Sequence, residues 1–204
     1  MLGASNIYPE SSLTYTWTAT SVPSGALSPV FSDAGTNTAK NATVTTFKSG
    51  SYTFLVTIAD PSGGTTTSSV TTTVTLKPFD NWRVQQFGFS ANNPAIAGAT
   101  VDADSDGLDN LQEYAFNTNP NAFQPGVLPF STFDGTNLSL TYRQNDAATD
   151  VSFVVEQSTD LLNWTPATPT TTTLSNDGST SLIKATVPVG TAQVLMLRLR
   201  VTLQ

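Results

Sequence analysis

The 204-residue chain contains no cysteine and no histidine. The lack of cysteine excludes disulfide bonds and thiolate nucleophiles. Together the two absences exclude zinc sites built on these residues and every histidine-based catalytic triad. No apolar run reaches the ~18 residues that a membrane-spanning helix needs, so we expect no membrane insertion. Met1-Leu2-Gly3 does not begin the charged and then apolar pattern of a signal peptide.

Charged residues are also scarce, at 11% of the chain, against ~25% in an average soluble protein. Eight Lys and Arg face fifteen Asp and Glu, which gives a net charge of -7. Without a basic stripe to meet phosphate groups, nucleic acid is not an expected partner. Threonine is abundant instead, and its branched Cβ favours strands. Surfaces rich in threonine, serine and asparagine are common in secreted β-modules, although residues 168–173 also fit a low-complexity linker.

The first part of the chain, residues 1–77, is predicted to be a β-sandwich. Large apolar and small polar residues alternate in short runs that are separated by turn residues such as Asp60–Gly64, which is typical of half-buried strands in such a fold. The expected strands are Leu13–Ala19, Thr43–Phe47, Gly50–Ile58 and Val70–Leu76.

This part resembles bacterial immunoglobulin-like modules of the polycystic-kidney-disease (PKD) type. The resemblance rests on Tyr15-Thr-Trp17, Gly50-Ser-Tyr52-Thr-Phe54 and Val56-Thr-Ile58-Ala-Asp60. It implies that Trp17 belongs to the core. It also implies that this copy lacks its first strand, which such modules carry before Leu2-Gly3-Ala4. Either the chain was cut, or another copy or a neighbouring domain supplies a strand at an open sheet edge.

The second part, residues 78–123, is predicted to hold two short helices around an acidic loop. Phe79, Trp82 and Phe87 stand near helical spacing, and Pro78 or Asp80 is a suitable first residue. The second helix is expected within Leu108–Phe116, with Asp109 as N-cap and Asn117 as left-handed C-cap. The run from Gly88 to Val101 is expected to be non-helical.

The acidic loop runs from Asp102 to Glu113 and matches the calcium pattern D-x-D-x-D-G-x5-E without a gap. Calcium takes six to eight oxygen ligands, and carboxylates on alternate residues of a curling loop can all point inward. Gly107 allows the sharp turn. The predicted ligands are Asp102, Asp104, Asp106, the Leu108 carbonyl, Asn110 directly or through water, and Glu113.

The alternative interpretation is an acidic turn that only solubilises the chain, but crowded carboxylates repel one another without a cation. Magnesium is the weaker candidate because it needs a more regular octahedron. The stretch resembles thrombospondin type 3-like or dockerin-like calcium segments, which lie near the C-termini of large secreted bacterial proteins. The residues that carry this resemblance are Phe79, Trp82-Arg83, Asn93–Gly98, Asp102–Phe116 and Thr118-Asn119-Pro120. A dockerin has two loops and this chain has one, so docking of that type is not expected.

The third part, residues 124–204, is predicted to be a second antiparallel β-module. Asp134-Gly135 and Asn176-Asp177-Gly178 are hairpin signals. The expected strands are Leu138–Arg143, Val151–Gln157, Leu182–Val187 and Val194–Val201. Proteins that carry the calcium segment often continue into a module with residues like Val155–Trp164 and end in a strand like Arg198-Leu-Arg200-Val201.

No catalytic pattern is present, so an enzyme is not expected. Glutamate occurs three times, with Glu113 assigned to the metal and Glu156 expected to face solvent, which leaves no carboxylate pair for a glycosidase. The predicted fold is mostly β, with two antiparallel β-sandwich modules joined by a short helical calcium-binding segment.

The predicted function is that of a non-catalytic extracellular or cell-surface protein with a structural or adhesive role. It would be a surface-filament subunit or the C-terminal segment of a larger secreted protein, with calcium rigidifying the joint between its modules. The alternative is a carbohydrate-binding accessory region of a secreted polysaccharide-degrading enzyme. Its partners would then be glycans, stacked on Trp82, Trp164, Tyr142 or Tyr114, although core positions are the favoured interpretation for these aromatic residues.

Overall fold

The computed structural model describes residues 8–124, 127–191 and 194–204. The fold is mostly β, and every sheet is antiparallel. The chain divides into two compact units, Met1–Leu76 and Lys77–Gln204. Within the described ranges, no helix is long and apolar enough to cross a membrane. The expected place of the missing first strand, beside Leu2-Gly3-Ala4, lies outside the described residues.

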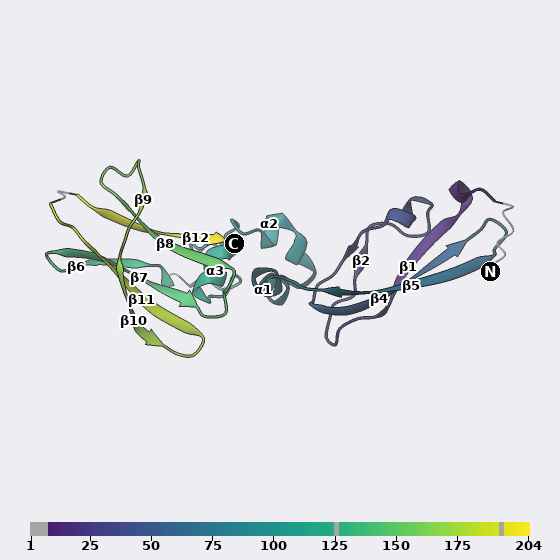
Figure 1. Cartoon of the computed structure of the whole chain (residues 1–204), viewed down its shortest axis with the longest axis horizontal. Coiled ribbons are helices and arrows are strands. Elements are labelled where there is room, and N and C mark those ends of the chain that lie inside the picture. The colour runs from purple at the N-terminus through teal and green to yellow at the C-terminus, as the bar shows by residue number, and fades with distance from the viewer. Residues whose placement is uncertain (1–7, 125–126, 192–193) are drawn as a thin grey trace. The chain divides into compact units, whose positions relative to one another are not determined.

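The first unit is built on a three-stranded sheet in the order β1-β4-β5, with a second sheet formed by β2 and β3 (Figure 1). Two short 3-10 helices, η1 and η2, accompany them. Asp60–Gly64 forms the predicted turn between β4 and β5. The elements are η1 (Glu10–Ser12), β1 (Thr14–Ser21), β2 (Val30–Phe31), η2 (Thr38–Asn41), β3 (Val44–Thr45), β4 (Gly50–Ala59) and β5 (Thr65–Val74).

The core of the first unit lies along the central strand β4. Tyr52, Phe54 and Val56 are buried at alternate positions, as the period of two predicts. Phe31 of β2 meets the Phe54 ring edge-on, with centroids 5.8 Å apart. Trp17 is half-buried, and its Nε1 donates a 2.9 Å hydrogen bond to the carbonyl oxygen of Ala39. Trp17 therefore packs against η2 while part of its ring remains accessible.

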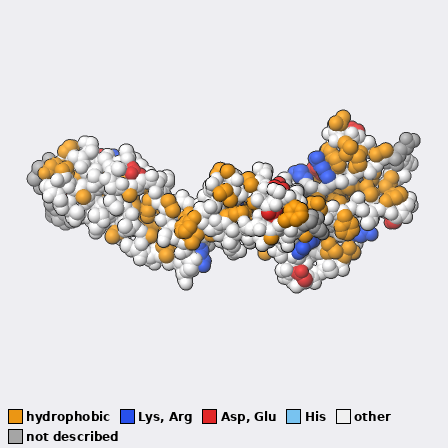
Figure 2. All heavy atoms as spheres, turned by 180° about the vertical axis from the view of Figure 1, so that it is seen from behind, with side chains coloured by type: hydrophobic (Ala, Val, Ile, Leu, Met, Phe, Trp, Pro, Cys, Tyr) orange, Lys and Arg blue, Asp and Glu red, His pale blue; other side chains and the backbone are white. Residues whose placement is uncertain are grey.

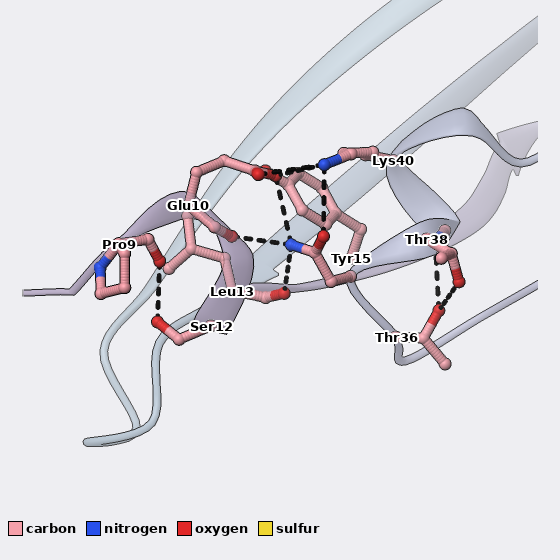
Figure 3. A network of polar contacts seen from close by, with 10 residues as sticks. Pro9, Glu10, Ser12, Leu13, Tyr15, Thr36, Thr38 and Lys40 are labelled. Carbon is pink, nitrogen blue, oxygen red and sulfur yellow. Dashed lines mark hydrogen bonds and ion pairs between the residues drawn. The ribbon is translucent and has the colours of Figure 1, made fainter.

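A surface network ties η1, β1 and η2 together (Figure 3). Lys40 Nζ lies 2.9 Å from Glu10 Oε1, and the Tyr15 hydroxyl donates to the same oxygen at 3.1 Å. Asn37 Nδ2 donates to the Glu10 and Leu13 carbonyl oxygens at 2.7 and 3.0 Å. The Lys40–Glu10 pair is about half exposed, so we attribute to it local ordering rather than large stabilisation.

Among the described residues, strand β5 pairs on one side only and forms a long, neutral sheet edge. It pairs with β4 without a register shift from Gly50–Val74 to Ala59–Thr65. All of its residues except Val74 are exposed, and none is charged or proline. The threonine run 65–67 therefore belongs to a strand. The face of the first unit seen at the left of Figure 2 is mostly neutral polar surface.

The second unit has two sheets that form separate layers (Figure 1). One has the order β10-β11-β7-β6 and the other β12-β8-β9. Buried Leu140, Tyr142, Val155 and Ala185 come from both sheets and form one apolar cluster. The strands are β6 (Phe130–Phe133), β7 (Asn137–Asn145), β8 (Val151–Ser158), β9 (Thr165–Pro166), β10 (Thr170–Asn176), β11 (Thr180–Pro188) and β12 (Met196–Leu203).

The linker interpretation of residues 168–173 is wrong for most of that run, because Thr170–Asn176 forms β10. This strand pairs with β11 through a bulge between Thr173 and Ser175. Both predicted hairpin turns are confirmed, since Asp134-Gly135 connects β6 to β7 and Asn176-Asp177-Gly178 connects β10 to β11.

In the described part of residues 77–124, the helical elements are α1 (Pro78–Phe87), η3 (Gly88–Asn92), α2 (Pro94–Ala97) and α3 (Asn110–Phe116). Of the two predicted first residues of α1, Pro78 and Asp80, the helix begins at Pro78. The expectation of a non-helical run from Gly88 to Val101 is wrong, because it contains η3 and α2. Asn93 explains α2, since its Oδ1 accepts a 3.0 Å hydrogen bond from Ala95 N and Pro94 supplies a preset helical φ.

The helices pack directly on the sheets. Phe79, Trp82 and Tyr114 form a buried ring cluster in which Tyr114 lies 5.2 and 5.6 Å from the other two centroids. Leu108, Ala115 and Phe116 form a second cluster, and it packs against β8 and β12. The helical segment and the C-terminal sheets therefore share one compact unit. Burial of Trp82 and Tyr114 also removes both as platforms for sugars.

Candidate metal centre

The acidic loop lies between α2 and α3 and brings three carboxylates together. Asp102, Asp104 and Asp106 each offer an oxygen, and these atoms all lie within 4.8 Å of one another. Three carboxylate oxygens at that spacing suit a hard divalent cation, whose ligand distances are about 2.3–2.6 Å for calcium. This part of the predicted ligand set is therefore assembled in the fold.

Two left-handed residues make the loop curl. Gly107 has a φ of 95°, as its place in the pattern predicts, and Ser105 has a φ of 65°. Asp102 holds this turn from inside, because its Oδ1 accepts from Ser105 N at 2.8 Å and its Oδ2 accepts from Gly107 N at 3.1 Å. The sequence pattern did not identify the left-handed conformation of Ser105.

Asp106 connects the loop to the segment that follows α3. Its Oδ1 accepts from Leu108 N at 2.9 Å and its Oδ2 accepts from Gln124 N at 2.9 Å. Each carboxylate oxygen has further acceptor capacity, so these contacts orient the group without excluding a cation. Asp104 differs, because its Oδ2 is buried and has no hydrogen-bond partner within the described ranges.

Helix α3 follows the loop directly and begins with a capping box. The Asp109 carboxylate accepts from Gln112 N at 2.8 Å, and the Gln112 side chain accepts from Asp109 N at 3.0 Å. The predicted N-cap is confirmed. Because residues three apart share a helix face, Asn110 and Glu113 lie together on the side of α3 that meets the loop.

The Asn110 side chain is fully buried and its orientation is determined by its donors. Nδ2 donates to the carbonyl oxygens of Ile96 at 3.0 Å and Gly98 at 2.8 Å. Since carbonyls accept and do not donate, the amide nitrogen must face them. Oδ1 therefore lies on the other side of the group, and it has no hydrogen-bond partner in the part of the chain that the structure describes.

Glu113 is the most unusual group of the loop. Its side chain is 0% exposed, and neither Oε1 nor Oε2 has a hydrogen-bond partner among the described residues. Burial, followed by the Asp104, Asp106, Asp102 and Asp109 carboxylates, raises the pKa of Glu113 to about 8. Burying a polar group without a partner costs about 1–3 kcal/mol, and more for a charged one. A cation at this position would remove that cost.

The other end of α3 is tied to the four-stranded sheet. Asn117 adopts the predicted left-handed C-cap conformation, with φ 57° and ψ 54°. Its Nδ2 donates to Thr180 Oγ1 of β11 at 3.0 Å, and Asn145 Nδ2 of β7 donates to the Tyr114 carbonyl oxygen at 2.8 Å. A ligand that holds Glu113 would therefore act on a helix that is bonded to two strands.

Among the predicted ligand residues, the three aspartates have oxygens that all lie within 4.8 Å of one another, and Glu113 is not part of that group. The three aspartates cluster, and Asn110 and Glu113 lie buried on the adjoining helix. Leu108 is buried by its side chain in the apolar cluster, and the role of its carbonyl stays a prediction. The sequence pattern missed the contributions of Ile96, Gly98 and Gln124, since backbone groups carry no signal in residue type.

The expectation that Glu156 faces solvent is wrong, because its carboxylate is buried. It is 6% exposed and is enclosed by two arginines of β12. Arg198 donates from Nε to Oε2 at 2.8 Å, and Arg200 donates from Nε to Oε1 at 2.7 Å. These bonds lower the pKa of Glu156. Arg198 also lies over the Trp164 ring, 4.3 Å from its centroid. Glu156 therefore forms structural ion pairs with both arginines, and Arg198 also covers a face of the Trp164 ring.

Comparison with known proteins gives no relative: no family model matches the chain, and no curated protein matches it.

Proposed function

We propose that residues 102–113 bind one calcium ion, which locks α3 onto the C-terminal sheets of a non-catalytic extracellular protein. The observation that carries this proposal is Glu113, whose two buried oxygens have no hydrogen-bond partner among the described residues. Protonation of one Glu113 oxygen would leave the other without a donor, and Oδ1 of Asn110 is likewise without a hydrogen-bond partner among the described residues. A calcium ion, with six to eight oxygen ligands, would satisfy both groups together with the three aspartates.

The packing of the helices points to what the ion would stabilise. From the sequence pattern alone, calcium is expected to rigidify the joint between the two modules. The contacts of α3 favour a more local role, because its residues pack with β8 and β12 and bond to β7 and β11. At millimolar extracellular calcium, even a site with a dissociation constant of about 10⁻⁴ M would contribute ~1.4 kcal/mol.

Thermal unfolding with calcium and with a chelator tests this proposal. We expect calcium to raise the Tm of the transition of the second unit by roughly 3–6 °C. Glu113→Gln removes the carboxylate and should abolish most of this shift. Asp109→Asn makes the same chemical change at a residue that caps α3 outside the ligand set, and asparagine caps as well as aspartate. It should keep the calcium response. Equal melting with calcium and chelator, with no binding by calorimetry, would refute the site.

A role in surface assembly belongs to the same proposal and rests on β5. This edge has ten residues in regular pairing on one side, with no charge, proline or bulge within it. Natural proteins usually protect exposed edges with such devices. Its neutral threonines therefore favour pairing with a strand from another copy or a neighbouring domain.

Sedimentation of the full chain tests assembly through β5. We expect self-association that rises with concentration and disappears in Thr67→Lys/Ser69→Lys, because lysines on an edge disfavour pairing. Thr16→Lys/Thr18→Lys places the same charges at exposed positions of β1 and is the control. If the parent chain and the Thr67→Lys/Ser69→Lys variant were both monomeric at all concentrations, self-pairing through β5 would be excluded.

A further inference from the structure

A polar depression opens between the two layers of the second unit, away from the acidic loop. Its volume is about 450 Å³, within the range of small-molecule sites. Tyr142 of β7 and Phe153 of β8 form its apolar part, with stacked rings whose centroids lie 5.8 Å apart. Thr171 and Thr173 of β10 line the other side.

The depression exists because one sheet is narrower than the other. Thr171 pairs with Ala185 and Thr173 with Ile183, whose side chains belong to the apolar cluster between the sheets. Paired residues share a face, so both threonines lie on the inner face of β10. Nevertheless every residue of β10 is exposed. The opposing sheet does not cover this strand.

The short pairing along one edge of β8 explains why the opposing sheet does not extend over β10. The two residues of β9 pair only with Glu156 and Gln157, and Ala167 N then donates to the Val155 carbonyl oxygen at 2.9 Å. Alternate residues of a strand direct their N–H and C=O groups to the same edge. Phe153 therefore directs its backbone groups to the edge that β9 does not reach, which borders the depression.

The side chains of the lining are uncharged, and several can both donate and accept hydrogen bonds. None of its residues is Asp, Glu, Lys or Arg, although the chain carries a net charge of -7. The residues of the lining include Thr171, Thr173 and Tyr142, which carry hydroxyl groups, and Gln144, which carries an amide. Within the described ranges, no hydrogen bond engages these side-chain groups, so a ligand could use them.

We propose that this depression is a binding site for a neutral sugar. A sugar ring matches the lining because its hydroxyls both donate and accept while its C–H groups suit apolar side chains such as Phe153 and Ile183. Absence of charge disfavours sugar acids, phosphates and amines, which would lose hydration without gaining an opposite charge. The site lies away from the calcium loop, and of the four aromatic residues that the sequence pointed to it includes Tyr142 alone.

Calorimetry and NMR on the calcium-saturated full chain test this proposal. The probes are uncharged mono- and disaccharides of the gluco, galacto, manno and xylo series at millimolar concentration. We expect at least one to bind and to shift the amide signals of Thr171, Thr173 and Phe153. Calcium saturation keeps the second unit stable, so a failed sugar titration would not be a failure of the calcium proposal.

Two matched double variants of β10 locate the binding. Thr171→Val/Thr173→Val removes both inward hydroxyls and should weaken the sugar roughly tenfold or more, since each hydrogen bond contributes about 0.5–1.5 kcal/mol. Thr170→Val/Thr172→Val makes the same change on the outer face and should alter affinity less than about twofold by the same reasoning. Both should keep the parent Tm within a few degrees.

Two results would overturn the proposal. One is the absence of binding by every neutral sugar of the panel. The other is binding that the two double variants weaken equally, which would place the sugar elsewhere. A synthetic extended peptide that shifts the same amide signals while the sugars do not would instead assign the open β8 edge to strand addition.

Discussion

The hydroxyl group of Tyr114 donates a 2.7 Å hydrogen bond to Oδ1 of Asp150. Asp150 precedes β8, and its Oδ2 accepts from Phe79 N at the start of α1 at 3.0 Å. One carboxylate therefore joins α1 and α3 to the C-terminal sheets. Because Tyr114 follows Glu113 in α3, the helix that carries the proposed ligand Glu113 is also held by this bond.

Replacement of the Tyr114 hydroxyl should lower stability. Tyr114→Phe leaves Oδ1 of Asp150 without its donor, and we expect a loss of about 1–3 kcal/mol in the free energy of unfolding. The control is Tyr142→Phe, whose hydroxyl has no hydrogen-bond partner among the described residues and whose loss should cost under about 1 kcal/mol by the same comparison. Urea unfolding measures both. Equal costs would show that the Asp150 bond contributes little.

The orientation of Asn110 predicts that an added charge weakens the site. Asn110→Asp would place two acceptors against the Ile96 and Gly98 carbonyls, which now receive both Nδ2 hydrogens. We expect a loss of about 2–4 kcal/mol in stability in chelator, from unpaired buried acceptors. Calcium should recover only part of it. If Asn110→Asp instead bound calcium more tightly at unchanged stability, the assigned amide orientation would be wrong.

The stability of the calcium-free protein should depend on pH through Glu113. Its pKa is raised from 4.5 to about 8 in the fold, so the folded state binds the proton more tightly than the unfolded chain. Its favourable contribution is therefore complete below pH ~4.5 and is lost as pH rises towards 8. We expect the second unit to lose about 2–4 kcal/mol between pH 5 and 8 in chelator.

Glu113→Gln is the variant that checks this assignment, because glutamine does not titrate. Chemical denaturation at several pH values should give a flat dependence for this variant, and calcium should flatten the dependence of the parent protein. A parent protein whose stability in chelator rises between pH 5 and 8 would contradict the assignment.

Glu156 should have the opposite pH dependence. Hydrogen bonds from Arg198 and Arg200 lower its pKa in the fold, so its stabilising contribution is present above the pKa of the unfolded chain. This contribution is lost as pH falls through the lowered value. We expect Glu156→Gln to reduce stability at pH 7 and to remove part of the acid sensitivity below pH ~4. Asp33→Asn, at an exposed position of the first unit, should leave the unfolding of the second unit unchanged.

Local structure followed the sequence where a single residue type determines it. The N-cap Asp109 and the C-cap Asn117 were predicted correctly, and Pro78 was one of two predicted first residues of α1. Each of them acts through its own side chain or backbone preference. Strand β4 was predicted almost to its ends, since one buried face gives a clean period of two.

The errors fall where local patterns carry little information. Strand β10 reads as a linker because threonines on both of its faces are exposed, so no apolar alternation marks it. Helix α2 was missed because a four-residue helix is shorter than the window in which periodicity can be detected. Glu156 was expected to face solvent because the two arginines that enclose it are distant in sequence.

The sequence by itself determined the acidic loop, its sharp turn and the caps of the helix that follows, because these depend on residues within one short segment. Only the tertiary structure decided that Glu113 and Asn110 are fully buried, that α3 packs on both sheets, and that β10 lacks a cover. Those properties depend on which distant segments exclude water from a side chain, and one-dimensional spacing does not contain that information.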